Sequence, residues 1–282
     1  MEKNAFVPFL YESSTIPEAL KKYEVSLRKS KDIEDILHAN KLEEYRNVIV
    51  DKKFLSTIRK IFNRTYSMIE KNYPNLKFYL EGRRKAAIST EKKNILYLSK
   101  NKSLDDFRDL LAFRIILFGD DHSMELIETA YSLMKNLIDF MILQGFTPCE
   151  ATEVFETEGF SNEDLNILVP DHSFLEENYK HLVKDYIVHP KKNGYQSLHV
   201  AFRDVSGKCF EVQIRTLAMH MLAESSDSAG HDFYKQKRYS DADIVFDRTQ
   251  IHMEGYGVMS EHVFDFIGLE SGLSILQRQK TF

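Results

Sequence analysis

The chain has 282 residues, of which 43% are hydrophobic and 29% are charged, so its composition is that of an ordinary globular protein and excludes a disordered or fibrous one. Its formal net charge of −5 argues against a protein that coats nucleic acid indiscriminately, although it allows a local basic groove. The sequence has no apolar run of about eighteen residues, no signal peptide and no C-x-x-C pattern at Cys149 or Cys209, so we expect a cytoplasmic protein without a membrane span, a disulfide framework or a zinc ribbon.

The N-terminal part of the chain is predicted to be helical. Helices are suggested at 16–29 and 33–48, and Pro17 suits the first helical position of the former. From residue 51 to 73 apolar side chains recur at helical spacing, and the Tyr73-Pro74 pair ends this helix.

Two strands and a long helix are predicted next. Residues 77–80 read as a strand that delivers the sequence EGRRK (81–85) at its end, where a glycine permits close backbone approach and the cations could hold polyphosphate. Residues 110–118 read as a buried strand. Ser123 is expected to cap a long amphipathic helix that closes at Gly145.

The segments NGYQSLHVAF (193–202) and EVQIRT (211–216) are predicted to form an antiparallel hairpin. In the second strand apolar and polar residues alternate, so one face points into a core and the other carries Glu211, Gln213 and Arg215. A strand that presents an acid, an amide and a base on one face is suited to a polyphosphate with its metal ion.

The remaining segments give weaker signals. Residues 146–180 are acidic and poorly patterned, as in an insertion or a lid. A helix is expected after Thr216, and one stripe of it carries His220, Glu224, Asp227 and His231. That stripe favours polar packing beside a nucleotide pocket, and a metal site is the alternative.

Five sequence blocks together resemble the synthetase domain of RelA/SpoT-type enzymes. In chain order they are EGRRK (81–85), DLLAFR (109–114), NGYQSLH (193–199), EVQIRT (211–216) and MHMLAE…H…YK (219–235). The resemblance implies a nucleotidyltransferase-like α+β fold, with a mixed sheet of roughly five strands flanked by helices. We expect an N-terminal helical extension at 1–50, the synthetase domain at 51–240 and a C-terminal extension at 241–282.

The activity that this resemblance implies is pyrophosphate transfer. Such an enzyme moves the β,γ-diphosphate of ATP to the 3′-hydroxyl of GDP or GTP and makes the alarmone (p)ppGpp. The sole His-Asp dipeptide is His231-Asp232, inside the synthetase blocks, so we do not expect the hydrolase activity of the multidomain members. A further hypothesis is a catalytically inactive nucleotide-binding module, which is disfavoured because the motif residues Asp109, Glu211, Arg83 and Tyr195 are all present.

A rival function shares the fold and the ATP site. Toxic members of the superfamily pyrophosphorylate the 3′ end of tRNA, block translation and are paired with a protein antitoxin. A basic cluster near the N-terminus suits either a solvated helix face or a path for an RNA backbone. It comprises Lys21, Lys22, Arg28, Lys29 and Lys31.

Two carboxylates are the predicted catalytic and metal-binding residues. The resemblance implies that Asp109 binds Mg²⁺ and that Glu211 is either a second metal ligand or the base that activates the acceptor hydroxyl. It further implies an ATP site in which two arginine planes sandwich the adenine and two lysines contact the phosphates. The arginines are Arg83 and Arg114, and the lysines are Lys85 and Lys93.

The predicted acceptor site is built around Tyr195, whose ring can stack on a base. Asn193 shapes the loop before it, and His199 faces the same cleft as a partly protonated imidazole that bonds phosphate. Lys184 and Lys191 are placed to hold a 5′-polyphosphate or an RNA backbone. Gln213, on the polar face of the hairpin, completes the acceptor-binding set.

Overall fold

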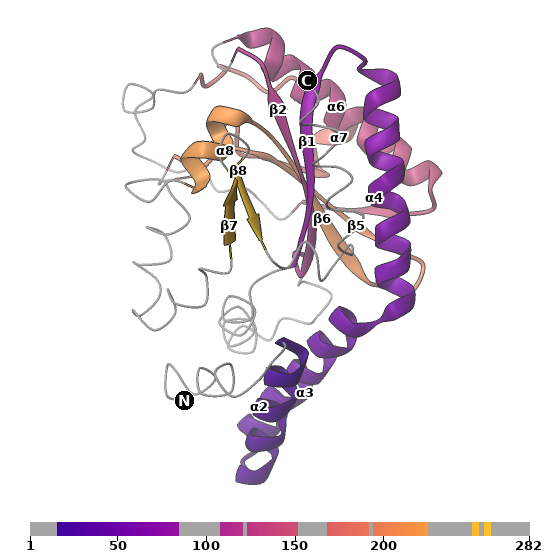
Figure 1. The fold of residues 1–282 in the computed structure, drawn as a ribbon, viewed down its shortest axis with the longest axis vertical. Coiled ribbons are helices and arrows are strands. Elements are labelled where there is room, and N and C mark those ends of the chain that lie inside the picture. The colour runs from indigo at the N-terminus through magenta and orange to yellow at the C-terminus, as the bar shows by residue number, and fades with distance from the viewer. Residues whose placement is uncertain are drawn as a thin grey trace.

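A computed structural model gives the fold of the chain (Figure 1). It describes residues 16–84, 108–120, 123–151, 168–191, 194–224, 250–253 and 257–260. Its helices there are α2 (Ile16–Ser30), α3 (Ile33–Val50), α4 (Lys52–Asn72), α6 (Met124–Leu143), α7 (Glu177–Lys180) and α8 (Leu217–Glu224). Its strands there are β1 (Lys77–Arg84), β2 (Leu111–Phe118), β3 (Thr147–Cys149), β4 (Val183–Asp185), β5 (Leu198–Arg203), β6 (Cys209–Thr216), β7 (Gln250–Met253) and β8 (Gly257–Ser260).

Six of these strands form one mixed sheet in the order β1-β2-β6-β5-β3, with β4 also paired to β5. β2 and β6 are parallel, whereas every other pair in this sheet is antiparallel. β7 and β8 form a separate two-stranded ribbon. The prediction of an α+β fold with a mixed sheet flanked by helices is therefore confirmed, and the sheet has six strands rather than about five.

One face of the sheet is covered by α4 and α6, which lie on the same side of it (Figure 1). Their apolar side chains form the main core with the inward-facing residues of the strands. The rings of Phe62 on α4 and Phe113 on β2 meet edge to face at 5.2 Å, and Phe113 also contacts Phe210 on β6 at 5.3 Å. Burial of each such ring contributes roughly 1.5–3 kcal/mol, so this core fixes the sheet whose opposite face carries the polar residues.

The two long helices begin where the sequence predicts. Asp51 caps α4 by accepting from the Phe54 amide at 2.9 Å, and Ser123 caps α6 by accepting from the Glu125 amide. Gly145, with a φ of 84°, follows the end of α6 in the left-handed conformation that glycine adopts without strain.

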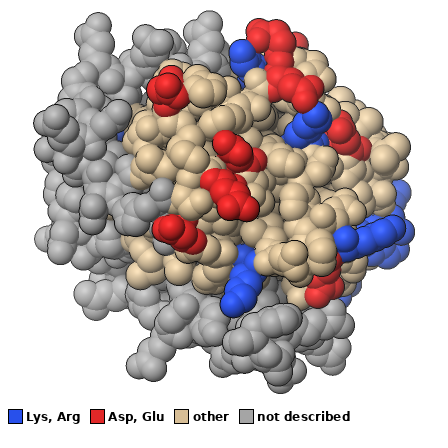
Figure 2. All heavy atoms as spheres, turned by 90° about the horizontal axis from the view of Figure 1, so that it is seen from above, with Lys and Arg blue, Asp and Glu red and all other residues tan. Residues whose placement is uncertain are grey.

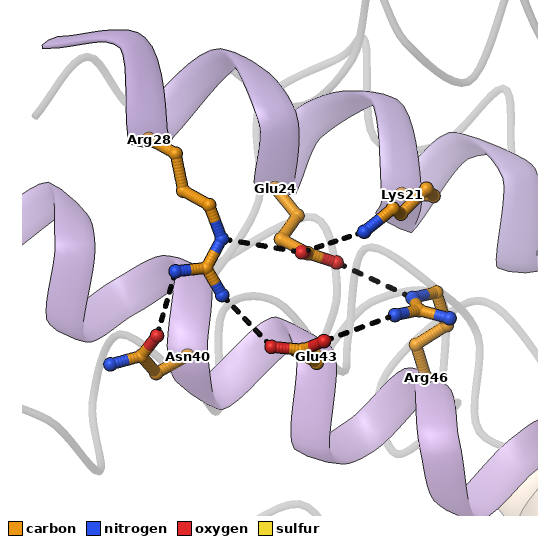
Figure 3. A network of polar contacts seen from close by, with 6 residues as sticks. All are labelled: Lys21, Glu24, Arg28, Asn40, Glu43 and Arg46. Carbon is orange, nitrogen blue, oxygen red and sulfur yellow. Dashed lines mark hydrogen bonds and ion pairs between the residues drawn. The ribbon is translucent and has the colours of Figure 1, made fainter.

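Helices α2 and α3 pack against each other at the N-terminal end of α4, away from the sheet (Figure 1). Glu24 on α2 is 2% exposed and accepts from Lys21 at 2.9 Å, from Arg28 at 3.3 Å and from Arg46 of α3 at 3.4 Å (Figure 3). Arg28 also pairs with Glu43 of α3 at 2.9 Å. Burial opposes the charge on Glu24, but its cationic neighbours outweigh it and hold the pKa of the carboxyl below its ordinary value.

These ion pairs bear on the predicted basic cluster. Lys21 and Arg28 are held by Glu24, and Lys22 pairs with Glu18 at 3.0 Å. Lys29 and Lys31 are exposed. Figure 2 shows a different face, the top of the molecule in Figure 1, where acidic and basic groups are scattered among uncharged ones. Most of the cluster is thus neutralised within the helix pair, and its use as an RNA path stays a prediction.

One predicted boundary is wrong. The strand that begins at Lys77 does not end at Leu80 but continues through Arg84, because all eight of its residues pair with β2. The poorly patterned segment 146–180, for which the sequence predicts no element, contains β3 and α7. Within the described residues, no helix combines the length and the apolar character needed to cross a membrane.

Candidate active site

The face of the sheet opposite α4 and α6 carries a transverse row of polar residues. Backbone pairing places Glu81 of β1 opposite Arg114 of β2, and Arg114 beside Gln213 of β6. Gln213 in turn lies opposite His199 of β5, which lies opposite Lys184 of β4. Because residues in register point to the same face of a sheet, five strands contribute one continuous polar line.

Glu211 stands beside this row, two residues before Gln213 on the same strand. Its cross-strand neighbours are Ala112 on one side and Ala201 on the other. Both neighbours end at a methyl group, so neither fills the space next to the carboxylate. The sheet therefore holds one largely buried acid, 9% exposed, between two small residues.

Two donors contact the Glu211 carboxylate. The side-chain amide of Gln213 donates from Nε2 to Oε1 at 2.6 Å, and Nδ1 of His199 lies 3.3 Å from the same oxygen. On the other side of the imidazole, Nε2 lies 2.8 Å from the Tyr195 hydroxyl. A neutral imidazole that donates from Nδ1 and accepts at Nε2 satisfies both contacts.

The charge state of this group follows from its surroundings. Burial opposes the charge on Glu211 but is outweighed by the contacts from His199 and the Gln213 amide, so the pKa of the carboxyl lies below its ordinary value. Burial lowers the pKa of His199 and the adjacent carboxylate only partly opposes this, while burial raises the pKa of Tyr195. We conclude that near pH 7 the acid is ionised and that the imidazole and the phenol are neutral.

Asp109 precedes β2 and is half-buried. Its negative charge acts on Glu211 and raises the pKa of that carboxyl, so the two predicted catalytic carboxylates share one electrostatic environment. Within the described residues no group of three or more His, Cys, Asp or Glu side chains could hold a metal ion. Two carboxylates suit Mg²⁺, which commonly takes one or two protein oxygens and completes its shell with water and substrate phosphates. The donor set therefore fits the predicted ion.

Arg114 is buried at the centre of the row. Its NH1 donates to Glu81 Oε1 at 2.7 Å, and its Nε lies 3.5 Å from the Gln213 amide oxygen. The side chain is 4% exposed. In this arrangement the guanidinium is committed to its neighbours, so stacking on adenine would require it to move away from Glu81.

The loop 186–197, which connects β4 to β5, carries Tyr195. Asp185 anchors its start by accepting from the amides of Ile187 at 3.1 Å and Val188 at 3.2 Å. The same buried carboxylate accepts from the hydroxyls of Tyr131 on α6 and Ser173. The loop is thereby fastened to the core on the face opposite the polar row.

Tyr195 is surrounded by cations and a second tyrosine. The Lys191 ammonium lies 4.6 Å from the centroid of its ring and 4.4 Å from that of Tyr186. The Arg215 guanidinium lies 6.0 Å from the Tyr195 ring and bonds Nδ1 of His220 at 2.6 Å. A base stacked on Tyr195 would have to share or displace one of these cations.

The structure brings most of the described candidates into one neighbourhood. Those gathered around the polar row are Asp109, Arg114, Lys184, Lys191, Tyr195, His199, Glu211 and Gln213. Lys85, Lys93 and Asn193 lie outside the described residues, as do Asp227 and His231 of the predicted stripe. Arg83 lies on β1, but its side chain is not described.

Sequence reasoning assigned no role to two residues that build this neighbourhood, Glu81 and Tyr186. His220, which contacts Arg215, belongs to the stripe for which polar packing beside a nucleotide pocket is predicted. For Arg215 the alternation along its strand already placed the side chain on the polar face. For Glu81 the pairing with Arg114 depends on strand register, which a single sequence does not give.

Comparison with known proteins finds a family match for part of this site. Residues 165–239 match the family described as the region found in RelA / SpoT proteins. This segment is therefore similar to the RelA/SpoT region. It contains β4, loop 186–197, the β5–β6 hairpin and α8, whereas Glu81, Asp109 and Arg114 precede it.

Relatives of the RelA/SpoT region are short matches within much longer proteins. A probable chloroplastic GTP diphosphokinase of Arabidopsis thaliana is 54% identical over 54 residues, which are 19% of this chain and 8% of that protein. GTP pyrophosphokinases of Haemophilus influenzae and Escherichia coli are 49% and 45% identical over 61 and 62 residues, each covering 21% of this chain and 8% of the relative. The chain thus spans under a tenth of the length of these relatives.

Solved structures similar to the chain include small alarmone synthetases. Synthetase 1 of Bacillus subtilis, bound to its product pppGpp, is 15% identical with a TM-score of 0.41, and the match covers 85% of this chain and 94% of that one. Synthetase 2 of the same organism is 16% identical with a TM-score of 0.37, covering 80% and 92%.

Proposed function

We propose that the chain is an ATP-dependent pyrophosphokinase that transfers the β,γ-diphosphate of ATP to the 3′-hydroxyl of GDP or GTP and so makes (p)ppGpp. The observation that carries the proposal is the largely buried Glu211 carboxylate, which lies between two alanines beside the polar row and is contacted by Gln213 and His199. The RelA/SpoT region that contains it, and relatives named GTP pyrophosphokinase, support the same reaction.

The transfer requires one proton acceptor and an in-line approach. The 3′-oxygen of the acceptor forms a bond to the β-phosphorus of ATP, and the bond from that phosphorus to the oxygen bridging the α- and β-phosphates breaks. The electron pair leaves with AMP, and the hydroxyl proton passes to a base. Glu211 is the proposed base, because its ionised carboxylate is the form that can receive the proton.

The donor half-site lies on the β1–β2 side of Glu211. We propose that Asp109 holds Mg²⁺, which when bound would neutralise charge on the transferred phosphates, and that Glu211 acts as the base rather than as a second ligand. Arg114, with Arg83, Lys85 and Lys93, is the proposed ATP-binding set. Arg114 is close to Glu211 through a single intervening side chain, that of Gln213.

The acceptor half-site lies on the β5 side. The ring of Tyr195 is the proposed stacking surface for the guanine base. Lys184 and Lys191 are the proposed phosphate contacts, and Asn193 is proposed to shape the loop before Tyr195. Lys184 and Lys191 both lower the pKa of His199 by their charge, and Lys184 pairs with His199 across β4 and β5, which supports assigning both lysines to the acceptor side. An anionic acceptor phosphate near these lysines would complement that positive field.

The test is a labelling experiment with three acceptors. Purified protein is incubated with γ-labelled ATP, Mg²⁺ and GDP, GTP or deacylated tRNA, and the products are separated. Label in guanosine tetra- or pentaphosphate, together with AMP release and its loss in Glu211→Gln, supports the proposal. Label in tRNA would establish the rival toxin activity, and label in neither would leave a nucleotide-binding module.

A further inference from the structure

The two oxygens of the Glu211 carboxylate are in different situations. Oε1 is contacted both by Gln213 Nε2 at 2.6 Å and by His199 Nδ1 at 3.3 Å. Among the described residues, no donor reaches Oε2. A carboxylate held by two donors at one oxygen has a fixed plane, so the direction in which its second oxygen points is fixed as well.

The Gln213 amide is oriented by a third side chain. Its oxygen is turned toward Nε of Arg114, at 3.5 Å, and Arg114 is in turn paired with Glu81 at 2.7 Å. Because an amide that offers its oxygen to a guanidinium must turn its NH₂ group away, Nε2 is directed at Glu211. The orientation of the Gln213 amide, which donates to the carboxylate on this side, is therefore fixed by Arg114 of β2 and Glu81 of β1.

The His199 ring is oriented in the same way from the opposite side. Its Nε2 lies 2.8 Å from the Tyr195 hydroxyl, which fixes which ring nitrogen faces Glu211. The rings of Tyr195 and Tyr186 meet the imidazole edge to face, at 5.8 and 5.3 Å. The orientation of the imidazole ring is therefore fixed by contacts with Tyr186 and Tyr195 of loop 186–197.

We propose that Gln213 and His199 are positioning residues, which hold Glu211 by Oε1 and leave Oε2 as the oxygen that receives the proton of the acceptor hydroxyl. The inference rests on the proposed pyrophosphokinase activity, and it departs from the sequence-based prediction that both residues bind the acceptor. Contacts from the ATP side, through Arg114, and from the acceptor side, through Tyr195, then converge on one oxygen.

If Gln213 is a positioning residue, its substitution should lower kcat and leave the acceptor KM almost unchanged. Gln213→Met keeps the approximate volume and removes the amide, so Oε1 loses its shorter contact. Because a misplacement of about 1 Å can cost on the order of 100-fold, we expect kcat to fall about 10–100-fold. The acceptor KM and the dissociation constant for GDP measured by calorimetry should change less than about threefold, as expected for a loss felt only in the transition state. Ser206→Ala, in the exposed turn of the same hairpin, is the matched control.

The two ring nitrogens of His199 can be replaced one at a time. In His199→Asn the amide nitrogen can occupy the place of Nδ1 and still donate to Glu211, whereas in His199→Gln it can occupy the place of Nε2 and still reach Tyr195. We expect His199→Asn to keep kcat within about fivefold of wild type and His199→Gln to lose about 10–100-fold. Thermal unfolding of each variant shows whether it is folded at the assay temperature.

The outcomes distinguish this inference from the proposed function. If the wild-type chain labels no acceptor, the proposed function fails before any variant is compared. If the wild type is active, a Gln213→Met enzyme with normal kcat and a raised acceptor KM overturns the positioning role. An equal or reversed ranking of His199→Asn and His199→Gln overturns it independently.

Discussion

The bond between Tyr131 and Asp185 offers a sharp test of how loop 186–197 is held. Tyr131→Phe removes the hydroxyl that lies 2.9 and 2.8 Å from the two oxygens of the buried Asp185 carboxylate, and it leaves the buried ring in place. Burial and the charge of Asp185 raise the pKa of this hydroxyl, so it is a neutral donor in any ordinary assay buffer. A hydrogen bond to a charged group contributes about 1.5–3 kcal/mol, and we expect a loss of that size.

Tyr179→Phe is the matched control. The Tyr179 hydroxyl donates to Asp139 at 2.9 and 3.1 Å, which is the same chemistry with an exposed carboxylate. Water replaces the lost contact there, so we expect a cost of about 1 kcal/mol or less.

Urea unfolding followed by circular dichroism measures both costs, provided that the slope with denaturant is unchanged. For a domain of this size, 1 kcal/mol corresponds to about 2–4 °C in Tm, so Tyr131→Phe should lower Tm by about 3–12 °C. Equal losses in the two variants would refute the argument that burial of Asp185 sets the strength of the anchor. Because Asp185 begins the loop that carries Tyr195, only Tyr131→Phe should also raise the acceptor KM.

Three other substitutions test separate parts of the structure. Tyr195→Ala should raise the acceptor KM about tenfold or more by removing a stacking contact of about 1–3 kcal/mol, and a selective loss of ATP affinity would contradict the assignment. Asp51→Ala should lower the unfolding free energy by about 1 kcal/mol through loss of the α4 cap, whereas Asp51→Asn, which can still cap, should cost less; equal costs would point to the Lys208 ion pair instead. At a pH above the ordinary carboxyl pKa, the free energy of unfolding of wild type should exceed that of Glu24→Gln. This difference should vanish as the pH falls through the lowered pKa of Glu24 in the folded protein. A difference that does not depend on pH would show that the charge of Glu24 is not the stabilising feature.

Local signals in the sequence were enough for the elements that end in a cap or a turn. Ser123 and Gly145 bound α6 as predicted, because a cap and a left-handed glycine act within one helical turn. The β5–β6 hairpin is confirmed for a similar reason, since alternation of apolar and polar residues needs no distant partner. The pairing of β2 with β6, by contrast, has no local signal.

Short or partner-dependent features were beyond the sequence. β3 has three residues and contains Pro148, and its strand state comes from pairing with β5 rather than from propensity. The four extra residues of β1 likewise follow from its register with β2. In the candidate site, the residue types on β6 were foreseeable, but the contact of Glu81 with Arg114 required the three-dimensional register.

The parallel alignment of β2 with β6 has a consequence for how the protein matures. Asp109 and Glu211 are separated by about a hundred residues of chain, and long-range parallel pairing forms slowly because the intervening chain must first be ordered. During synthesis the first carboxylate leaves the ribosome well before its companion exists. Premature termination anywhere between them would thus yield a polypeptide lacking the proposed chemistry altogether, so a truncated product would not consume ATP by this route.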